Sequence, residues 1–202
     1  MKLLLYMMNK KIYAMKKLQI LLLFVITLFP SVLISQNTKS KKEVRKEMQN
    51  ERKAQEAHLD SINRQMALLA VSSNSWVLNA TSINTTGGTV TYVQPNVNFI
   101  KTEGSMMTFQ TSTGFGGGLN AMGGVTLRGM IVGKSHSDDK GSISYTYNVR
   151  GTAFNAIVIL TFDNEGDTAT AFLNFDNGYS LTMYGEVQPY SVNSVTEGTS
   201  IN

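Results

Sequence analysis

Residues 142–187 read SISYTYNVRGTAFNAIVILTFDNEGDTATAFLNFDNGYSLTMYGEV, and the spacing of their side chains sets the expected fold class. In the first nine residues Ile, Tyr, Tyr and Val alternate with Ser, Ser, Thr and Asn, so apolar and polar groups fall on opposite faces of an extended chain. Short separators rich in Asp, Asn and Gly divide the later runs, and Asn177-Gly178 is a strong signal for a tight hairpin turn. The pattern predicts consecutive antiparallel strands joined by hairpins.

The same alternation extends toward the N-terminus. Strands are expected at 75–80, 89–93, 96–102, 106–111, 124–132, 142–150, 153–162, 168–175 and 179–187. About nine strands at a spacing near ten residues predict an all-β domain over 73–190, either a single antiparallel β-barrel or a β-sandwich. Residues 153–162 are apolar on both faces, which predicts a strand covered on both sides. Because helices do not alternate with the strands, an α/β enzyme fold is not expected.

Residues 36–72 predict a charged amphipathic helix that leads into the β domain. The stretch 39–70 contains no Gly or Pro and is rich in Lys, Glu, Gln, Arg and Ala, which favour helix. Its apolar stripe becomes regular only at Leu59, Ile62, Met66 and Leu69. A sustained coiled coil needs three or four heptads, so we expect a linker helix whose last turns dock or self-associate.

Residues 1–35 predict a secretory signal peptide. Lys16 and Lys17 precede an apolar run over 18–29, and Pro30 and small polar residues follow, with cleavage expected near Ser35. Met15 is then the possible natural start, and the mature protein is expected in the periplasm or outer envelope, or secreted. The alternative is an uncleaved membrane anchor, although the almost unbroken apolar run before Pro30 and Ser31 falls short of the roughly 20 apolar residues of a comfortable span.

Charge and cysteine content exclude several function classes. The chain has 18 basic and 14 acidic residues, but without the five lysines of residues 1–17 the balance is 13 to 14. A mature protein near neutrality has no large positive field for nucleic acid. The absence of cysteine removes disulfides, thiol catalysis and thiolate metal sites. We expect no cofactor, and membrane contact only through the signal segment or peripheral association.

A glycine-rich segment, GFGGGLNAMGG at 114–124, is the most unusual local feature. A phosphate loop would continue into Lys and a helix, whereas a strand is predicted here, so nucleotide-binding motifs do not fit. The segment predicts either a hairpin with a sharp bend or a flap over a barrel mouth. In the second case Phe115, Leu119 and Met122 are the candidate ligand-binding contacts.

Catalytic and metal-binding sets are not evident. His136, Asp138 and Asp139 share a short stretch that reads either as a metal or acid–base group or as a solvated hairpin loop, and we predict no metal site. There is no Gly-x-Ser-x-Gly motif. The carboxylates available for hydrolysis are Glu103, Asp163, Glu165, Asp167, Asp176 and Glu186, most of them in predicted turns. Since no catalytic residue can be named, we predict a protein that is not an enzyme.

Several motifs resemble a domain-of-unknown-function family of secreted Gram-negative envelope proteins of the gut-anaerobe type. They are Trp76-Val-Leu-Asn-Ala80, Pro95-Asn-Val-Asn-Phe-Ile100, Phe109-Gln110, Gly118-Leu-Asn-Ala-Met-Gly-Gly124, the segments 125–129 and 141–151, and Tyr184-Gly185. The resemblance covers residues 40–190 and implies a signal, a charged helix and a β domain, without any assigned activity. Asp60-Ser61-Ile62 and Asp167-Thr168-Ala169 also resemble the three-residue acceptor of periplasmic O-glycosylation.

Together these features favour a non-enzymatic binding protein. The leading hypothesis is a secreted or periplasmic β domain that binds a small apolar or glycan ligand, or an envelope protein partner. The alternative is a structural cell-envelope module that assembles through its N-terminal helix. A hydrolase using strand-end carboxylates such as Glu186 is the third hypothesis. The polar residues 191–202 predict a flexible tail.

Overall fold

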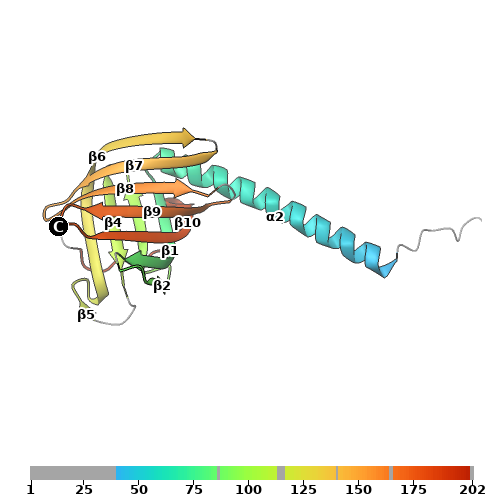
Figure 1. The fold of residues 1–202 in the computed structure, drawn as a ribbon, viewed down its shortest axis with the longest axis horizontal. Coiled ribbons are helices and arrows are strands. Elements are labelled where there is room, and N and C mark those ends of the chain that lie inside the picture. The colour runs from blue at the N-terminus through green and yellow to red at the C-terminus, as the bar shows by residue number, and fades with distance from the viewer. Residues whose placement is uncertain (1–39, 86, 113–116, 140, 164–165, 201–202) are drawn as a thin grey trace, which may run out of the picture. The chain divides into compact units, whose positions relative to one another are not determined.

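Eight antiparallel strands close into a barrel in the computed structural model of the protein, which describes residues 40–85, 87–112, 117–139, 141–163 and 166–200 (Figure 1). The eight are β1 (Trp76–Thr85), β3 (Phe99–Glu103), β4 (Met106–Thr111), β6 (Met122–Asp139), β7 (Ser142–Arg150), β8 (Asn155–Phe162), β9 (Thr168–Phe175) and β10 (Ser180–Pro189). Each pairs with the next along the chain, and β10 returns to β1 with Trp76 opposite Pro189 and Thr85 opposite Leu181. This last pairing makes the domain a barrel, so the all-β prediction is confirmed and the sandwich is excluded.

Two short strands complete the sheet. Strand β2 (Val90–Tyr92) pairs with the second half of β1, and β5 (Gly117–Gly118) runs parallel to the start of β6. Strand β6 is much longer than the predicted 124–132, because its residues up to Asp139 stay paired with the start of β7. The stretch holding His136 and the two aspartates is therefore strand rather than loop.

A single long helix, α2 (Lys41–Ser72), precedes the strands in the described residues. The chain forms two compact units, 1–52 and 53–202, and the helix runs through the boundary between them. In the first unit the helix begins after Ser40, whose backbone N–H donates to Glu43 Oε2 at 2.9 Å, a reciprocal capping arrangement. None of the described helices is both long enough and apolar enough to span a membrane.

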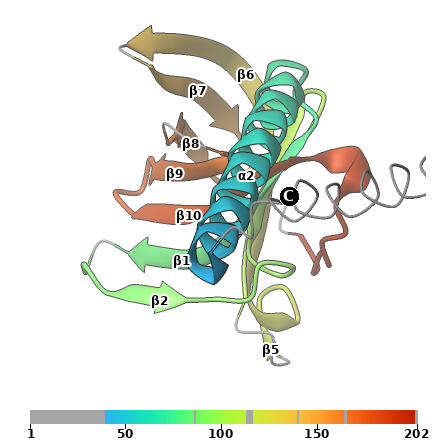
Figure 2. The same cartoon turned by 90° about the vertical axis from the view of Figure 1, so that its right-hand side faces the viewer.

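The last turns of α2 close one end of the barrel (Figure 2). Ala67, Ala70 and Val71 are buried in the same apolar cluster as the inward-facing strand residues. Lys134 on β6 secures this end, since its Nζ donates to Val71 O at 2.6 Å and to Asn74 Oδ1 at 2.7 Å. The lysine thus satisfies a carbonyl that the end of a helix leaves without an intrahelical partner.

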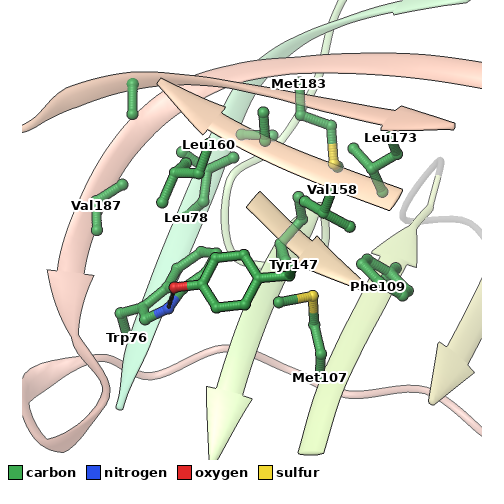
Figure 3. Packing of buried hydrophobic residues seen from close by; sticks show 14 of the residues in the cluster. Trp76, Leu78, Met107, Phe109, Tyr147, Val158, Leu160, Leu173, Met183 and Val187 are labelled. Atoms are coloured by element: carbon green, nitrogen blue, oxygen red, sulfur yellow. Dashed lines mark hydrogen bonds between the residues drawn. The ribbon is translucent and has the colours of Figure 1, made fainter. Parts of the chain in front are cut away.

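The barrel interior is filled by side chains near the helix-covered end. Trp76 and Tyr147 are fully buried, their ring centroids lie 5.9 Å apart, and Trp76 Nε1 donates to the Tyr147 hydroxyl at 3.2 Å (Figure 3). Burial raises the pKa of Tyr147 well above its ordinary value, so the hydroxyl stays protonated. Leu78, Leu160 and other inward residues continue the core toward the middle of the barrel.

Strand β8 is covered on its inner face only. Its inward residues are buried, whereas Ile157 and Ile159 on the outer face are 44% and 36% exposed. The prediction that residues 153–162 are covered on both sides is therefore wrong. The reason is that α2 packs its small residues on the end of the barrel, where Arg64 also donates to Asp163 O at the end of β8.

The C-terminal segment 190–200 runs along the outside of β3, β4 and β6. After η1 (Tyr190–Val192), Thr196 N donates to Asn96 O at 2.9 Å and Thr199 N donates to Asn120 O at 3.2 Å. Glu197 pairs with Lys101 at 2.8 Å and with Arg128. The described part of the region predicted as a flexible tail is therefore held by hydrogen bonds and ion pairs.

Candidate functional site

The barrel end opposite α2 contains a hollow of about 340 Å³. It lies where β4 and β9 end and where β6 and β10 begin, whereas α2 packs at the ends where β1 begins and β8 ends. Its lining consists of Phe109, Gln110, Thr111, Val125, Leu127, Ala153, Phe154, Leu173, Phe175, Asn177, Tyr179, Leu181 and Met183. The barrel is thus packed at one end and hollowed at the other.

Three phenylalanine rings form the wall of this mouth pocket. Phe109, Phe154 and Phe175 have centroid separations of 6.0 to 6.1 Å, with edge-to-face angles of 62° to 78°. This geometry is favourable for aromatic pairs and stiffens the wall. Gly151 allows it, because a side chain at that position would overlap the ring of Phe154. Tyr179 packs against Phe175 at 6.2 Å and is partly exposed at the rim.

None of the described residues that line the mouth pocket has a charged side chain. Its polar residues are Gln110, Thr111, Asn177 and Tyr179. The Gln110 side chain is bonded to Thr196 and Gly198 of the C-terminal segment, and the side-chain carbonyl of Asn177 accepts a hydrogen bond from Tyr179 N at 3.0 Å. The deep residues Leu173 and Met183 are fully buried, so the floor of the pocket is apolar. A site of this kind can hold an uncharged apolar group.

Two of the three predicted contact residues, Leu119 and Met122, are not part of the mouth-pocket lining. Phe115 lies outside the described residues. Leu119 is 68% exposed in the turn after β5, and Met122 is half-buried at the start of β6. The lining of β6 begins only at Val125. A flap formed by the glycine-rich segment stays a prediction.

The described part of that glycine-rich segment is a turn locked by Asn120. The fully buried Asn120 side chain accepts hydrogen bonds from Met122 N and Gly124 N, both at 3.0 Å, and donates to Thr111 O and Thr126 Oγ1, both at 3.2 Å. A methyl group on Gly124 would overlap the Thr111 backbone. The glycine therefore permits the close approach of two strands, which is a structural role.

Sequence reasoning did not identify the mouth-pocket residues. Phe109, Phe154, Phe175 and Leu181 appear in the sequence as ordinary strand aromatics and aliphatics, for which core packing is the stronger prior. These residues could have been found from their positions in the predicted strands, because inward-facing residues near the strand ends at one end of a barrel line its opening. Phe109, Phe175 and Leu181 are inward residues next to a turn, at the same end of the barrel.

The polar candidates for metal binding or catalysis are dispersed. His136, Asp138 and Asp139 are exposed on β6, where the His136 ring stacks on Tyr145 at 5.8 Å. Among the described residues no group of three possible metal ligands is close enough to hold an ion. Glu186 is exposed on the outer face of β10.

The acidic residue Glu103 belongs to the group of ion pairs that holds the C-terminal segment against the barrel. Hydrogen bonds from Lys101 and then from Tyr190 lower the pKa of Glu103. Burial opposes the charge on Lys101, but its hydrogen bonds with Glu103 and Glu197 leave its pKa raised. These groups are therefore committed to an ion-pair network that holds the segment 190–200.

Comparison with known proteins identifies the family. Residues 58–187 match the sequence profile of a family described as Domain of unknown function (DUF4251). The chain is similar to a crystal structure of a DUF4251 family protein from Bacteroides eggerthii DSM 20697, with a TM-score of 0.55 and 26% identity, covering 65% of this chain and 91% of that chain. No curated protein matches the sequence. The predicted resemblance is thereby confirmed, and the protein belongs to the DUF4251 family.

Proposed function

We propose that this protein is a non-catalytic binding protein that holds a small, uncharged apolar molecule in the mouth pocket. The observation that carries the proposal is an apolar hollow of about 340 Å³ at the end of the barrel that α2 does not cover. Ligand sites in proteins are commonly apolar concavities of about 300–1,000 Å³ with a few polar groups that fix orientation. The mouth pocket is at the small end of this range, which limits the ligand to a compact molecule or to one end of a chain.

The expected affinity is modest. An apolar ligand that loses roughly 200 Å² of exposed surface gains about 5 kcal/mol at 25 cal/mol per Å². Loss of translational freedom offsets part of this gain. The stiff Phe109–Phe154–Phe175 wall reduces the ordering required on binding. We therefore expect dissociation constants on the order of 0.1 to 1 mM or weaker.

The experiment uses an uncharged fluorescent probe, N-phenyl-1-naphthylamine, titrated against the mature chain. Ala153→Trp places an indole at the rim, where Ala153 is exposed and lines the pocket. Thr152→Trp is the matched control, since Thr152 is exposed in the same turn but does not line it. The proposal predicts enhanced fluorescence with the natural chain and the control, and its loss with Ala153→Trp. Equal responses from both variants would refute it.

We also propose that the protein acts beyond the inner membrane, in the periplasm or outer envelope, after cleavage near Ser35. The support is the order of Lys16 and Lys17, the apolar run 18–29 and the polar residues that follow. The intact mass of protein isolated from its own cells should correspond to a chain that begins near Gln36. A mass that includes residues 18–34 would show instead that the segment is retained.

A second candidate function is a structural module that assembles through α2. Leu59, Ile62, Met66 and Leu69 form a row at spacings of 3, 4 and 3, and all four are exposed, Leu69 by 69%. Because Ala67, Ala70 and Val71 occupy the barrel-facing side, this row is free to pack on another helix. Sedimentation velocity should show an oligomer of the natural chain. The double variant Leu59→Gln, Met66→Gln should be monomeric, whereas Gln65→Ala, at an exposed position, should remain oligomeric. A monomeric natural chain would exclude this candidate.

A further inference from the structure

The outer wall formed by β7 to β10 has no charged side chain across its central rows. One row runs through Asn148, Ile157, Asn174 and Ser180, and the next runs through Thr146, Ile159, Phe172 and Thr182. A third row contains Thr161, Thr170 and Tyr184. We call these eleven residues the neutral face. Its polar members carry hydroxyls and amides, and its apolar and aromatic members Ile157, Ile159, Phe172 and Tyr184 are exposed by 36% to 44%.

A hollow of about 330 Å³ lies at one edge of the neutral face. Its lining consists of Val132, Asn148, Val149, Arg150, Asn155, Ala156, Ile157, Asn174, Phe175 and Asp176. The register of β6 and β7 shifts between Ile131 and Gly133, which leaves Gly133 opposite Asn148. Since glycine has no side chain, nothing from that position fills the hollow beside the Asn148 amide.

The side chains around this hollow combine paired donors and acceptors with an apolar floor. The amides of Asn148 and Asn174 flank Ile157 in register, and no hydrogen bond joins either amide to another described group. Asn155 Nδ2 donates to Asp176 Oδ2 at 2.8 Å, which orients both groups at the rim. Each amide offers two N–H donors and a carbonyl acceptor from one planar group.

The amides, carboxylate and apolar surface around the hollow suit a sugar better than an apolar ligand or a charged polymer. A sugar hydroxyl both donates and accepts, which suits planar amide and carboxylate groups, while the C–H faces of the ring suit aliphatic and aromatic surface. The charges at the hollow are one Arg150 and one Asp176, which balance. The core of a protein interface is typically richer in aromatic residues and arginine than this hydroxyl- and amide-rich wall.

We propose that the neutral face binds a neutral saccharide chain, with one hexose seated in the hollow between Asn148 and Asn174 and its neighbours lying across Ile159, Phe172 and Tyr184. This site is on the outside of the barrel wall and is separate from the mouth pocket. Its ligand class is hydroxyl-rich, whereas the mouth pocket takes an apolar group. The two sites are tested by different variants.

The test measures binding of the mature chain to maltohexaose, cellohexaose and mannohexaose by calorimetry, with polygalacturonate as an acidic comparison. The proposal predicts binding of at least one neutral hexamer and no binding of the acidic polymer. Asn148→Ala with Asn174→Ala should weaken it at least about tenfold, because two amide groups are removed and each ordinary hydrogen bond accounts for a several-fold change in affinity. Asn50→Ala, an exposed asparagine on α2, is the matched control and should leave it unchanged.

Three outcomes would overturn the proposal. The first is no heat of binding with any of the three neutral hexamers. The second is equal affinity of the natural chain and the double asparagine variant. The third is a dimer in sedimentation velocity that the double variant dissolves, which would assign the neutral face to a second copy of the chain. Both asparagines are exposed, so the substitutions do not disturb the barrel core. Ala153→Trp should leave saccharide binding intact, which separates this test from that of the mouth pocket.

Discussion

Replacing Gln110 by leucine removes the residue that joins the C-terminal segment to the barrel wall. The fully buried side chain donates to Val97 O at 3.0 Å and to Thr196 O at 2.8 Å, and it accepts from Thr126 Oγ1 at 2.7 Å and from Gly198 N at 2.8 Å. Leucine keeps most of the volume, so the expected effect comes from lost hydrogen bonds and not from a cavity.

The size of the loss in free energy of unfolding depends on which former partners of Gln110 stay buried without a hydrogen bond. Val97 O and the Thr126 hydroxyl belong to the wall and cannot turn to water, although Thr126 Oγ1 keeps the bond from Asn120. Thr196 and Gly198 can leave with the segment. An unsatisfied buried group costs about 1–3 kcal/mol, and a lost net hydrogen bond about 1 kcal/mol. We expect Gln110→Leu to lower the free energy of unfolding by about 2–4 kcal/mol.

The assay is urea denaturation of the mature chain, combined with limited proteolysis of residues 193–200. Gln110→Leu should lower the denaturation midpoint and make the segment susceptible to cleavage. Gln94→Leu is the matched control because Gln94 is exposed, and a surface change of this kind stays within about 0.5 kcal/mol. A Gln110→Leu variant as stable as this control, with its segment still protected, would refute the role assigned to the network.

Four further predictions concern the helix-covered end of the barrel and the exposed hydroxyls. Trp76→Phe and Tyr147→Phe each remove one partner of the 3.2 Å hydrogen bond, and a double-mutant cycle in thermal unfolding should give a coupling of about 1 kcal/mol. Because burial raises the pKa of Tyr147 in the folded chain above its value in the unfolded chain, the free energy of unfolding falls as the pH rises above about 10. In urea titrations above pH 10, the free energy of unfolding should fall less steeply with pH for Tyr147→Phe than for the natural chain. The same dependence on pH in both proteins would contradict the raised pKa of Tyr147. Lys134→Met should lower the free energy of unfolding by about 1–2 kcal/mol, because the end of α2 loses its donor, and no change in the urea midpoint would contradict this. The hydroxyl-bearing residues Ser61 and Thr168 are exposed, so protein from its own cells should carry glycan mass that Ser61→Ala and Thr168→Ala remove, and an unmodified natural mass would exclude it.

The strands were predictable because their signal is local. From 142 to 187 each strand either alternates or, in β8, forms a short apolar run, and turn residues divide it from the next, so β7 to β10 follow from the sequence within a few residues. Barrel closure was not predictable in this way. It depends on β1 pairing with β10, more than 100 residues later, and no local pattern distinguishes that pairing from a sandwich edge.

The C-terminal segment and the mouth pocket show two other limits. Residues 193–200 make their hydrogen bonds with polar groups such as Gln110 and Asn120, and polar contacts of this kind leave no periodic signal. The mouth pocket depends on inward residues of separate strands ending at the same height. The pattern within one strand predicts which side chains point inward, but not which ends of different strands lie together along the barrel axis. The unusual glycine-rich segment was therefore the candidate ligand-binding site that the sequence offered.

The most direct measurement is native mass spectrometry of the mature protein purified from the cells that make it. We expect a non-covalent adduct with the mass of a small apolar molecule on the natural chain and on Thr152→Trp, and its absence from Ala153→Trp, whose indole occupies the rim of the mouth pocket. A natural chain without such an adduct, or an apolar adduct that Ala153→Trp retains, would contradict the claim that the open end of the barrel holds an apolar ligand.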